Sequence, residues 1–166
     1  MKRISTNHLL EILTELAKAK VKFIICGGVA VVLHGVERMT VDLDIILDFT
    51  PQNVKAFLKT VKRLGLIPRV PVPPEILMHE TQREILIKGK NAIVFTFLDP
   101  DNPFRIIDVL LGKDKSYASL YSGSEKKRIG KYLIRVASKR QIVAMKKKVK
   151  PLRDKDRFDI KALDRL

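Results

Sequence analysis

The sequence predicts an α/β fold in a single domain, and two observations carry this prediction. Short apolar runs rich in branched residues alternate with longer runs whose apolar residues recur at helical spacing, which is the element order typical of α/β proteins. The chain has 166 residues, of which 46% are hydrophobic and 31% charged, enough for one domain with a sizeable core. We expect residues 1–112 to form an α/β core and residues 113–166 a basic, mostly helical C-terminal portion.

The first part of the chain predicts helices and strands in alternation. Thr6 is a suitable N-cap for an amphipathic helix over residues 7–18. The apolar run 23–26 predicts a buried strand that Gly27-Gly28 interrupts. The elements expected next are a short helix over 29–33 closed by Gly35, a strand over 41–47, and a helix that has Thr50 as its N-cap, begins at Pro51 and ends at Gly65.

The rest of the chain has weaker signals. Four prolines at 68, 71, 73 and 74 predict a loop or an extended edge segment. Strands are expected at 83–88, 92–98, 104–111 and 131–136, with turns at 89–91 and 99–103 and some helix near 117–121. Ser138 and Gln141 form a capping box that starts a helix to about residue 149, and after Pro151 a final helix is expected over 153–165.

Asp42 and Asp44 are the most informative side chains, because residues two apart on a strand project to the same face. Two carboxylates within apolar sequence repel each other and lose hydration, and a divalent cation between them relieves both costs. Surface carboxylates on a half-exposed strand are the plainer interpretation. The neighbouring Gly27-Gly28, Arg38 and Thr40 favour the metal site.

The Gly27-Gly28 turn predicts a phosphate-binding element beside these carboxylates. Glycines let the backbone approach a ligand closely, and N–H groups at the start of a helix bind phosphate, although a tight turn alone also explains the pair. Arg38 is expected to contact a phosphate or a carboxylate. Thr40 is either part of this element or only the start of a strand, and His34 is more typical of a core or helix-end histidine than of a base.

Asp108 is the candidate third carboxylate. It is a single acid in an apolar strand, and burying it unpaired is costly, so it either pairs with an arginine or faces the same metal. Asp48 is the rival, although it lies at a strand end where caps and turns are common. Asp99 and Asp101 form a second Asp-x-Asp, for which a turn is the better interpretation.

These residues carry a resemblance to a known family. The sequence resembles the polymerase-β-like nucleotidyltransferase superfamily, and within it most of all the small AbiEii toxin-type proteins. The first part of the resemblance is Gly27-Gly28, His34-Gly35, Arg38-x-Thr40 and Asp42-x-Asp44-Ile45. The second is a helical lysine followed by Arg-x-Lys-Asp-x-x-Asp-Ile, here Lys146, Arg153, Lys155, Asp156, Asp159 and Ile160. The middle of the chain, residues 51–103, matches by element order only.

The resemblance implies a short mixed sheet with flanking helices and a metal-dependent nucleotidyltransferase. Asp42, Asp44 and Asp108 would then be the catalytic and metal-binding residues, with Mg²⁺ or Mn²⁺ as cofactor. The nucleoside triphosphate would bind to Gly27, Gly28, Arg38, Thr40, Lys146 and Asp156. The implied acceptor is a hydroxyl of RNA, protein or a small molecule, and a toxin or antitoxin partner is implied as well. The alternative is an inactive nucleic-acid-binding or antitoxin-type module on the same fold.

Charge and cysteine content bound the class of partner and the compartment. Of the net charge of +15, +12 lies in residues 115–166, where 17 Lys and Arg face 5 Asp and Glu. This predicts an anionic partner, although a solvated lysine-rich face explains it equally well. The single Cys26 excludes an internal disulfide, and we expect a cytoplasmic protein without a signal peptide. The longest uncharged run, 23–36, is too short to span a membrane.

Overall fold

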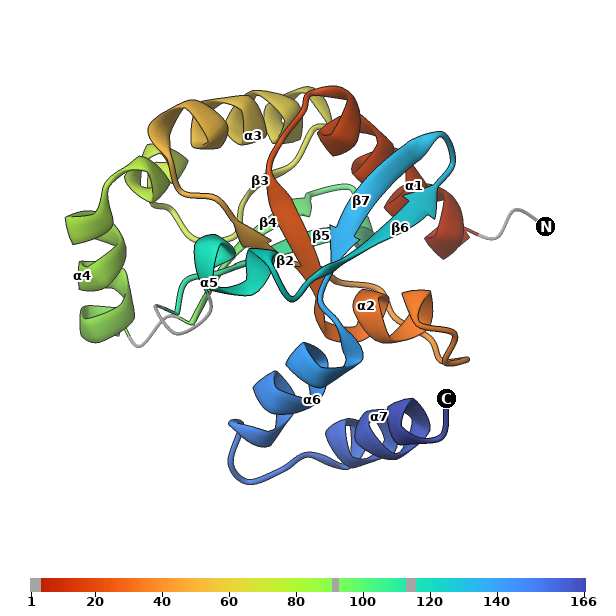
Figure 1. The fold of residues 1–166 in the computed structure, drawn as a ribbon. Coiled ribbons are helices and arrows are strands. Elements are labelled where there is room, and N and C mark those ends of the chain that lie inside the picture. The colour runs from red at the N-terminus through yellow and green to blue at the C-terminus, as the bar shows by residue number, and fades with distance from the viewer. Residues whose placement is uncertain (1–3, 91–92, 113–115) are drawn as a thin grey trace.

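A computed structural model describes residues 4–90, 93–112 and 116–166 of the chain. Its centre is a seven-stranded mixed sheet in the order β3-β4-β5-β2-β1-β7-β6 (Figure 1). The strands are β1 (Phe23–Cys26), β2 (Leu43–Leu47), β3 (Ile67–Pro68), β4 (Val94–Asp99), β5 (Asn102–Leu110), β6 (Glu125–Ile129) and β7 (Tyr132–Val136). The α/β class and the mixed sheet are as predicted, and β6 and β7 show that the sheet continues into the C-terminal portion.

Helices flank this sheet and cover it. In Figure 1, α1 and α3 lie together above the strands, whereas α2, α6 and α7 gather below them. The helices are α1 (Ile4–Lys18), α2 (Gly27–Leu33), α3 (Pro51–Arg63), the 3₁₀ helix η1 (Pro74–Met78), α4 (Glu80–Lys90), α5 (Tyr117–Tyr121), α6 (Lys139–Lys147) and α7 (Asp154–Asp164). In the described part of the chain, no helix is both long and apolar enough to cross a bilayer.

The central strands are buried on both faces. All four residues of β1 are buried, and β2 is buried except at Asp44, which is half-buried. Runs of branched apolar residues suit strands covered on both sides. The helical stripe Val54, Phe57 and Val61 of α3 packs into the same core, where the Phe57 ring meets that of Phe97 edge to face at 5.4 Å. The core therefore lies along the strands that hold the candidate carboxylates.

Several predicted boundaries are confirmed and a few are wrong. Pro51 starts α3 and Gly65 follows its end with φ +79°, but Thr50 makes no side-chain cap. Instead, the Thr50 N–H donates to the Asp48 carboxylate at 3.1 Å. Ser138 and Gln141 form the capping box expected at the start of α6. Helix α1 begins at Ile4, so Thr6 lies inside the helix and is not its N-cap.

The strand expected over 83–88 is wrong, because this segment is in α4. Its apolar residues Ile85, Leu86 and Ile87 are β-prone, yet a single face is buried: Leu86 is buried while Ile85 is 63% exposed. The predicted turn at 89–91 is also wrong for Gly89 and Lys90, which continue the helix, and Asn91 lies outside the described residues. The predicted strand start at Ala92 lies outside them as well, and β4 begins at Val94.

Candidate active site

The turn from β1 into α2 leaves no room for side chains at its two glycines. Gly27 has a φ of +64°, and a Cβ on it would lie 2.1 Å from the Asp44 Oδ2 atom. A Cβ on Gly28 would lie 2.6 Å from the Thr40 hydroxyl oxygen and 3.0 Å from the Arg38 guanidinium. Glycine is required here because the backbone packs directly against the polar side chains of the facing segment. The Thr40 hydroxyl thus occupies the space that a side chain at position 28 would need.

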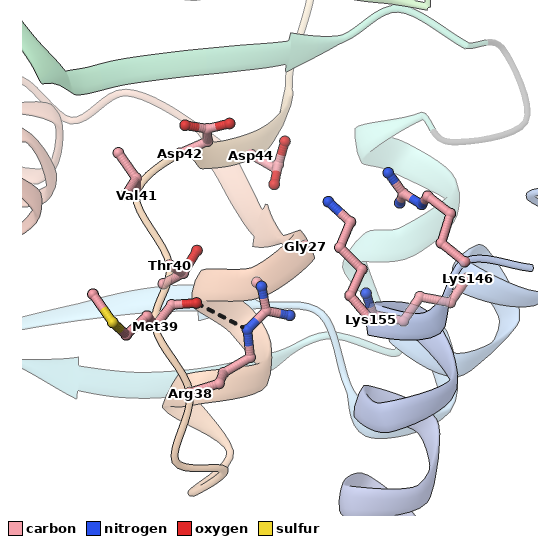
Figure 2. A pocket seen from close by; sticks show the side chains of 11 residues that line it. Gly27, Arg38, Met39, Thr40, Val41, Asp42, Asp44, Lys146 and Lys155 are labelled. Atoms are coloured by element: carbon pink, nitrogen blue, oxygen red, sulfur yellow. Dashed lines mark hydrogen bonds between the residues drawn. The ribbon is translucent and has the colours of Figure 1, made fainter.

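Sheet register brings the three predicted carboxylates to one place. Asp44 of β2 is the register partner of Asp108 in the parallel strand β5 and of Cys26 in β1, directly before the glycines. Asp42 lies one residue before β2, and Figure 2 shows its carboxylate beside that of Asp44. Burial and, to a smaller extent, the charges of Asp108 and Asp42 together raise the pKa of Asp44 from 3.8 to about 7. The three carboxylates are therefore close enough to oppose one another's ionisation.

Asp108 is held in a defined orientation. The Thr96 hydroxyl of β4 donates to its Oδ1 atom at 2.5 Å. Burial raises the pKa of Asp108, and this hydrogen bond acts in the opposite direction. Within the described part of the chain, no hydrogen bond to its Oδ2 atom is found, so this atom remains available to a ligand. Asp48, the rival third carboxylate, lies at the far end of β2, where it accepts from Thr50, so the structure brings Asp108 and not Asp48 to the pair.

The chemistry of this carboxylate set fits a divalent cation. Three carboxylates, one of them with a pKa near 7, are hard oxygen donors whose repulsion a Mg²⁺ or Mn²⁺ ion would relieve. Within residues 4–90, 93–112 and 116–166, however, no three His, Cys, Asp or Glu side chains are already grouped as a ligand set.

The opposite wall of the site carries cations fixed by α7. Asp156 and Asp159 are fully buried, and both accept from the Lys146 ammonium, at 3.0 and 2.9 Å. Asp159 also pairs with Arg38, 121 residues away along the chain. Asp156 pairs with Arg153 at 2.7 Å. Burial alone would raise the pKa of Asp156, but Arg153 and Lys146 hold it below its ordinary value.

Two adjoining cavities open at this site. The glycine-side cavity, about 290 Å³, is lined by Gly28, Arg38 and Thr40. The Asp108-side cavity, about 320 Å³, is lined by Asp108 and by apolar side chains such as Ile93, Leu110 and Met145. The residues that line both are Gly27, Asp42, Asp44, Lys146, Arg153 and Lys155. The carboxylates therefore stand at the junction of a polar cavity and a more apolar one.

The structure brings most of the predicted site residues together, with two exceptions in role. Asp156 lines neither cavity and contacts Lys146 and Arg153 instead. Lys155, which we did not single out for nucleotide binding, lines both cavities, and Figure 2 shows it reaching toward Asp44. The sequence signal that could have identified Lys155 is the Arg-x-Lys-Asp pattern, in which it is the lysine. His34 donates from Nε2 to the Ala137 carbonyl at 2.8 Å, which is the helix-end role expected for it.

Comparisons with known proteins agree with this geometry at the level of the fold. No family model matches the sequence, and no curated protein matches it either. Among solved structures, the chain is similar to the lincosamide antibiotic adenylyltransferase LnuA bound to lincomycin, with a TM-score of 0.63, 18% identity and 95% coverage of both chains. It is also similar to the antibiotic-resistance factor ANT(2'')-Ia in solution, with a TM-score of 0.62, 14% identity, and 98% and 84% coverage of this chain and that one.

A third similar structure is ANT(2'')-Ia in complex with adenylyl-2''-tobramycin, with a TM-score of 0.59, 16% identity, and 95% and 87% coverage. At these identities the likeness shows the fold alone. The chain has the fold of the polymerase-β-like nucleotidyltransferases, as predicted.

Proposed function

We propose that this protein transfers a nucleoside monophosphate from a nucleoside triphosphate to a hydroxyl group of an acceptor. The observation that carries the proposal is the meeting of Asp42, Asp44 and Asp108 beside the glycine turn, at the junction of two cavities. Three carboxylates next to a cation-lined cavity suit the transfer of a phosphoryl group. One of the similar structures is a lincosamide antibiotic adenylyltransferase and another is in complex with adenylyl-2''-tobramycin, which supports a transferase.

The glycine-side cavity is the proposed site of the triphosphate. The bare backbone at Gly27 and Gly28 lets phosphate oxygens approach closely, and Arg38 borders the same cavity. Lys146 and Lys155 face it from α6 and α7. Lys146 is shared with two buried carboxylates, whereas no ion pair of Lys155 is found among the described residues. Lys155 is therefore the cation most available to the departing phosphates.

The Asp108-side cavity is the proposed site of the acceptor. The hydroxyl oxygen of the acceptor attacks the α-phosphorus of the nucleoside triphosphate. The bond between that phosphorus and the oxygen that bridges it to the β-phosphate breaks, and pyrophosphate leaves. The hydroxyl proton passes to the Oδ2 atom of Asp108, since Oδ1 already accepts from Thr96. Asp42, Asp44 and Asp108 would hold Mg²⁺ or Mn²⁺, and the ion when bound supplies charge stabilisation for both reacting oxygens.

The cavity chemistry favours a small acceptor with an apolar part. Ile93, Leu110 and Met145 offer apolar contact next to Asp108. Two of the similar structures are bound to lincomycin or to adenylyl-2''-tobramycin. RNA and protein remain the other acceptor classes to test. The AbiEii likeness, the toxin–antitoxin partner and the cytoplasmic location stay predictions from the sequence.

The test is transfer of label from α-labelled nucleoside triphosphates, all four supplied with Mg²⁺ or Mn²⁺. Lincomycin, tobramycin, total RNA and cell lysate serve as acceptors. Asp42→Asn is expected to abolish transfer, whereas Asp101→Asn makes the same change in the exposed β4–β5 turn and should leave it intact. No transfer, together with no metal-dependent nucleotide binding by calorimetry, would contradict the proposal and favour the inactive module.

A further inference from the structure

A third cavity lies away from the carboxylates and gathers all the tyrosines of the chain. It has a volume of about 340 Å³ and lies between α5, the β6–β7 hairpin and the segment that joins α1 to β1. Tyr117, Tyr121 and Tyr132 all line it, and the sequence contains three tyrosines and no tryptophan. All three tyrosines therefore lie in one place, and Phe23 lines it as well. We call this hollow the tyrosine cavity.

The charged residues that line the tyrosine cavity are all cations. They are Lys20, Lys22, Lys126 and Arg135, and no Asp or Glu is among the lining residues. Lys22 is fixed through its backbone, since its N–H donates to the Asn53 side chain at 2.8 Å and its carbonyl accepts from it at 2.9 Å. Lys20 and Lys22 also line an adjoining hollow of about 350 Å³, so the basic surface continues beyond the tyrosines.

The Tyr121 ring presents one face to a cation of this surface. The rings of Tyr117 and Tyr121 lie 5.5 Å apart, and the Arg135 guanidinium lies 3.7 Å above the Tyr121 ring. Tyr121 remains 43% exposed despite this contact. A tyrosine face next to arginine and lysine is the arrangement on which unpaired bases stack while the cations neutralise the phosphates. An acidic peptide or a lipid headgroup would use the cations and leave the rings without a function.

We propose that the tyrosine cavity binds a short single-stranded nucleic acid. A base stacks on the Tyr121 and Tyr132 side of the cavity, and Lys20, Lys22 and Lys126 contact the phosphates that flank it. The cavity lies at the Phe23 end of β1, whereas the glycine turn follows Cys26 at the other end. At about 3.3 Å per residue these two places are roughly 13 Å apart along the strand. Binding here is therefore separate from the proposed transfer reaction.

The intrinsic tyrosine fluorescence of the protein reports on this cavity alone, because every tyrosine lines it and there is no tryptophan. A six-residue oligoadenylate RNA is titrated in EDTA without nucleoside triphosphate, so the result does not depend on transfer. Saturable quenching of the tyrosine emission is expected. With three phosphate contacts, raising NaCl from 50 to 200 mM should weaken binding by about 20-fold.

Variants measured by the anisotropy of labelled RNA separate stacking from charge. Tyr121→Leu is expected to weaken binding about tenfold, whereas Tyr121→Phe keeps a ring and should bind nearly as well as the unchanged protein. Lys22→Ala should weaken binding severalfold. Lys62→Ala is the matched control, because it removes the same charge from an exposed position on α3 that lines none of these cavities.

Three outcomes would overturn the proposal. The first is the absence of quenching at RNA concentrations that saturate the anisotropy signal, because the RNA would then be bound elsewhere. The second is equal affinity for an abasic oligomer of the same length, because the site would then recognise charge without bases. The third is equal loss of affinity in Lys22→Ala and Lys62→Ala. Thermal unfolding of each variant verifies that it is folded.

Discussion

Asp44 is the side chain whose environment is least favourable to its own charge. It is pressed against Gly27, paired in register with Asp108, and near Asp42. Its pKa of about 7 means that, without a bound cation, the folded protein keeps a proton on Asp44 between about pH 4 and pH 7, where the unfolded chain has lost it. Folding and ionisation of this group therefore oppose each other.

The free energy of unfolding should show this opposition as a pH dependence. Between about pH 4 and pH 7 the folded state holds the proton and the unfolded state does not, so the contribution of Asp44 to stability falls as pH rises. Asp44→Asn removes this loss. The free energy of unfolding of the variant minus that of the unchanged protein is expected to be about 2–4 kcal/mol larger at pH 8 than at pH 4. Urea unfolding of both proteins in EDTA at the two pH values measures it. An equal difference at both values would contradict the assignment.

Lys155 offers a second test at the level of one side chain. It lines both active-site cavities and reaches toward Asp44, and no ion pair of it is found in the described part of the chain. A charge-assisted contact with phosphate contributes about 1.5–3 kcal/mol, so Lys155→Ala is expected to weaken nucleoside triphosphate binding at least tenfold. Lys161→Ala is the control, since Lys161 is exposed on the same helix and lines neither cavity. Calorimetry that shows the same affinity for both variants would exclude this role.

The residue types at the site were readable from the sequence, but the contacts that orient them were not. Asp42 and Asp44 stand out because strand alternation and apolar neighbours are local signals. The pairing of Arg38 with Asp159 joins residues 121 positions apart, and no local pattern encodes it. Asp156 resembles a nucleotide ligand by its place in the motif, yet its carboxylate is turned inward onto Lys146 and Arg153.

At the scale of single elements, α7 acts as the support of the cationic wall. Its buried carboxylates Asp156 and Asp159 each contact two cations, and the helix contributes Leu163 to the core. Removing one partner of a buried ion pair leaves the remaining charges without compensation. The position of Lys146 and Arg38 at the cavity therefore depends on a helix that follows them by many residues.

Asp156→Asn is expected to lower the free energy of unfolding by about 2–4 kcal/mol, because Lys146 and Arg153 lose a charged acceptor. Asp154→Asn makes the same change two residues earlier, where the side chain is fully exposed and paired with Arg157, and should leave the free energy of unfolding nearly unchanged. Chemical denaturation measures both. Similar costs for the two variants would show that the buried cluster adds little to stability.

Secondary structure was predictable where the sequence itself carries a strong local pattern of apolar or capping residues. The strands β1, β2 and β5 are apolar and branched, and the capping box of α6 is a short-range signal. Strand β6 was not predicted because its sequence, EKKRI, is nearly all charged. It is the edge strand and pairs with β7 through backbone hydrogen bonds, so its side chains do not have to be apolar. Helix α4 shows the opposite error, since its branched residues favour a strand that tertiary packing does not form.

At the scale of the whole molecule, the sheet joins the two parts of the chain into one unit. Strand β7 pairs in parallel with β1, so the C-terminal portion covers a strand that leads into the active site. The buried hydrophobic residues that this portion contributes are Ile134, Val136, Ala137, Ile142 and Leu163. The boundary near residue 112 therefore divides the sequence by charge without dividing the core.

A fragment of residues 1–112 is expected to lack a cooperative unfolding transition, because it loses these core residues and the backbone partners of β1. Thermal unfolding followed by circular dichroism compares the fragment with the full chain. A sharp transition in the fragment would show that the core folds without β6 and β7. The full chain, measured alongside, provides the reference for a single cooperative unit.

The two outermost strands have a further consequence for how the protein behaves when concentrated. Strand β3 consists of two residues, one of them Pro68, and β6 carries Lys126, Lys127 and Arg128. Short, proline-containing or lysine-rich borders are poor templates for the backbone of a second molecule. An open sheet with apolar strands at its centre is thereby protected from joining edge to edge with its copies. The charged residues of β6, which made this strand hard to predict from the sequence, therefore also oppose edge-to-edge pairing of the sheets of two molecules.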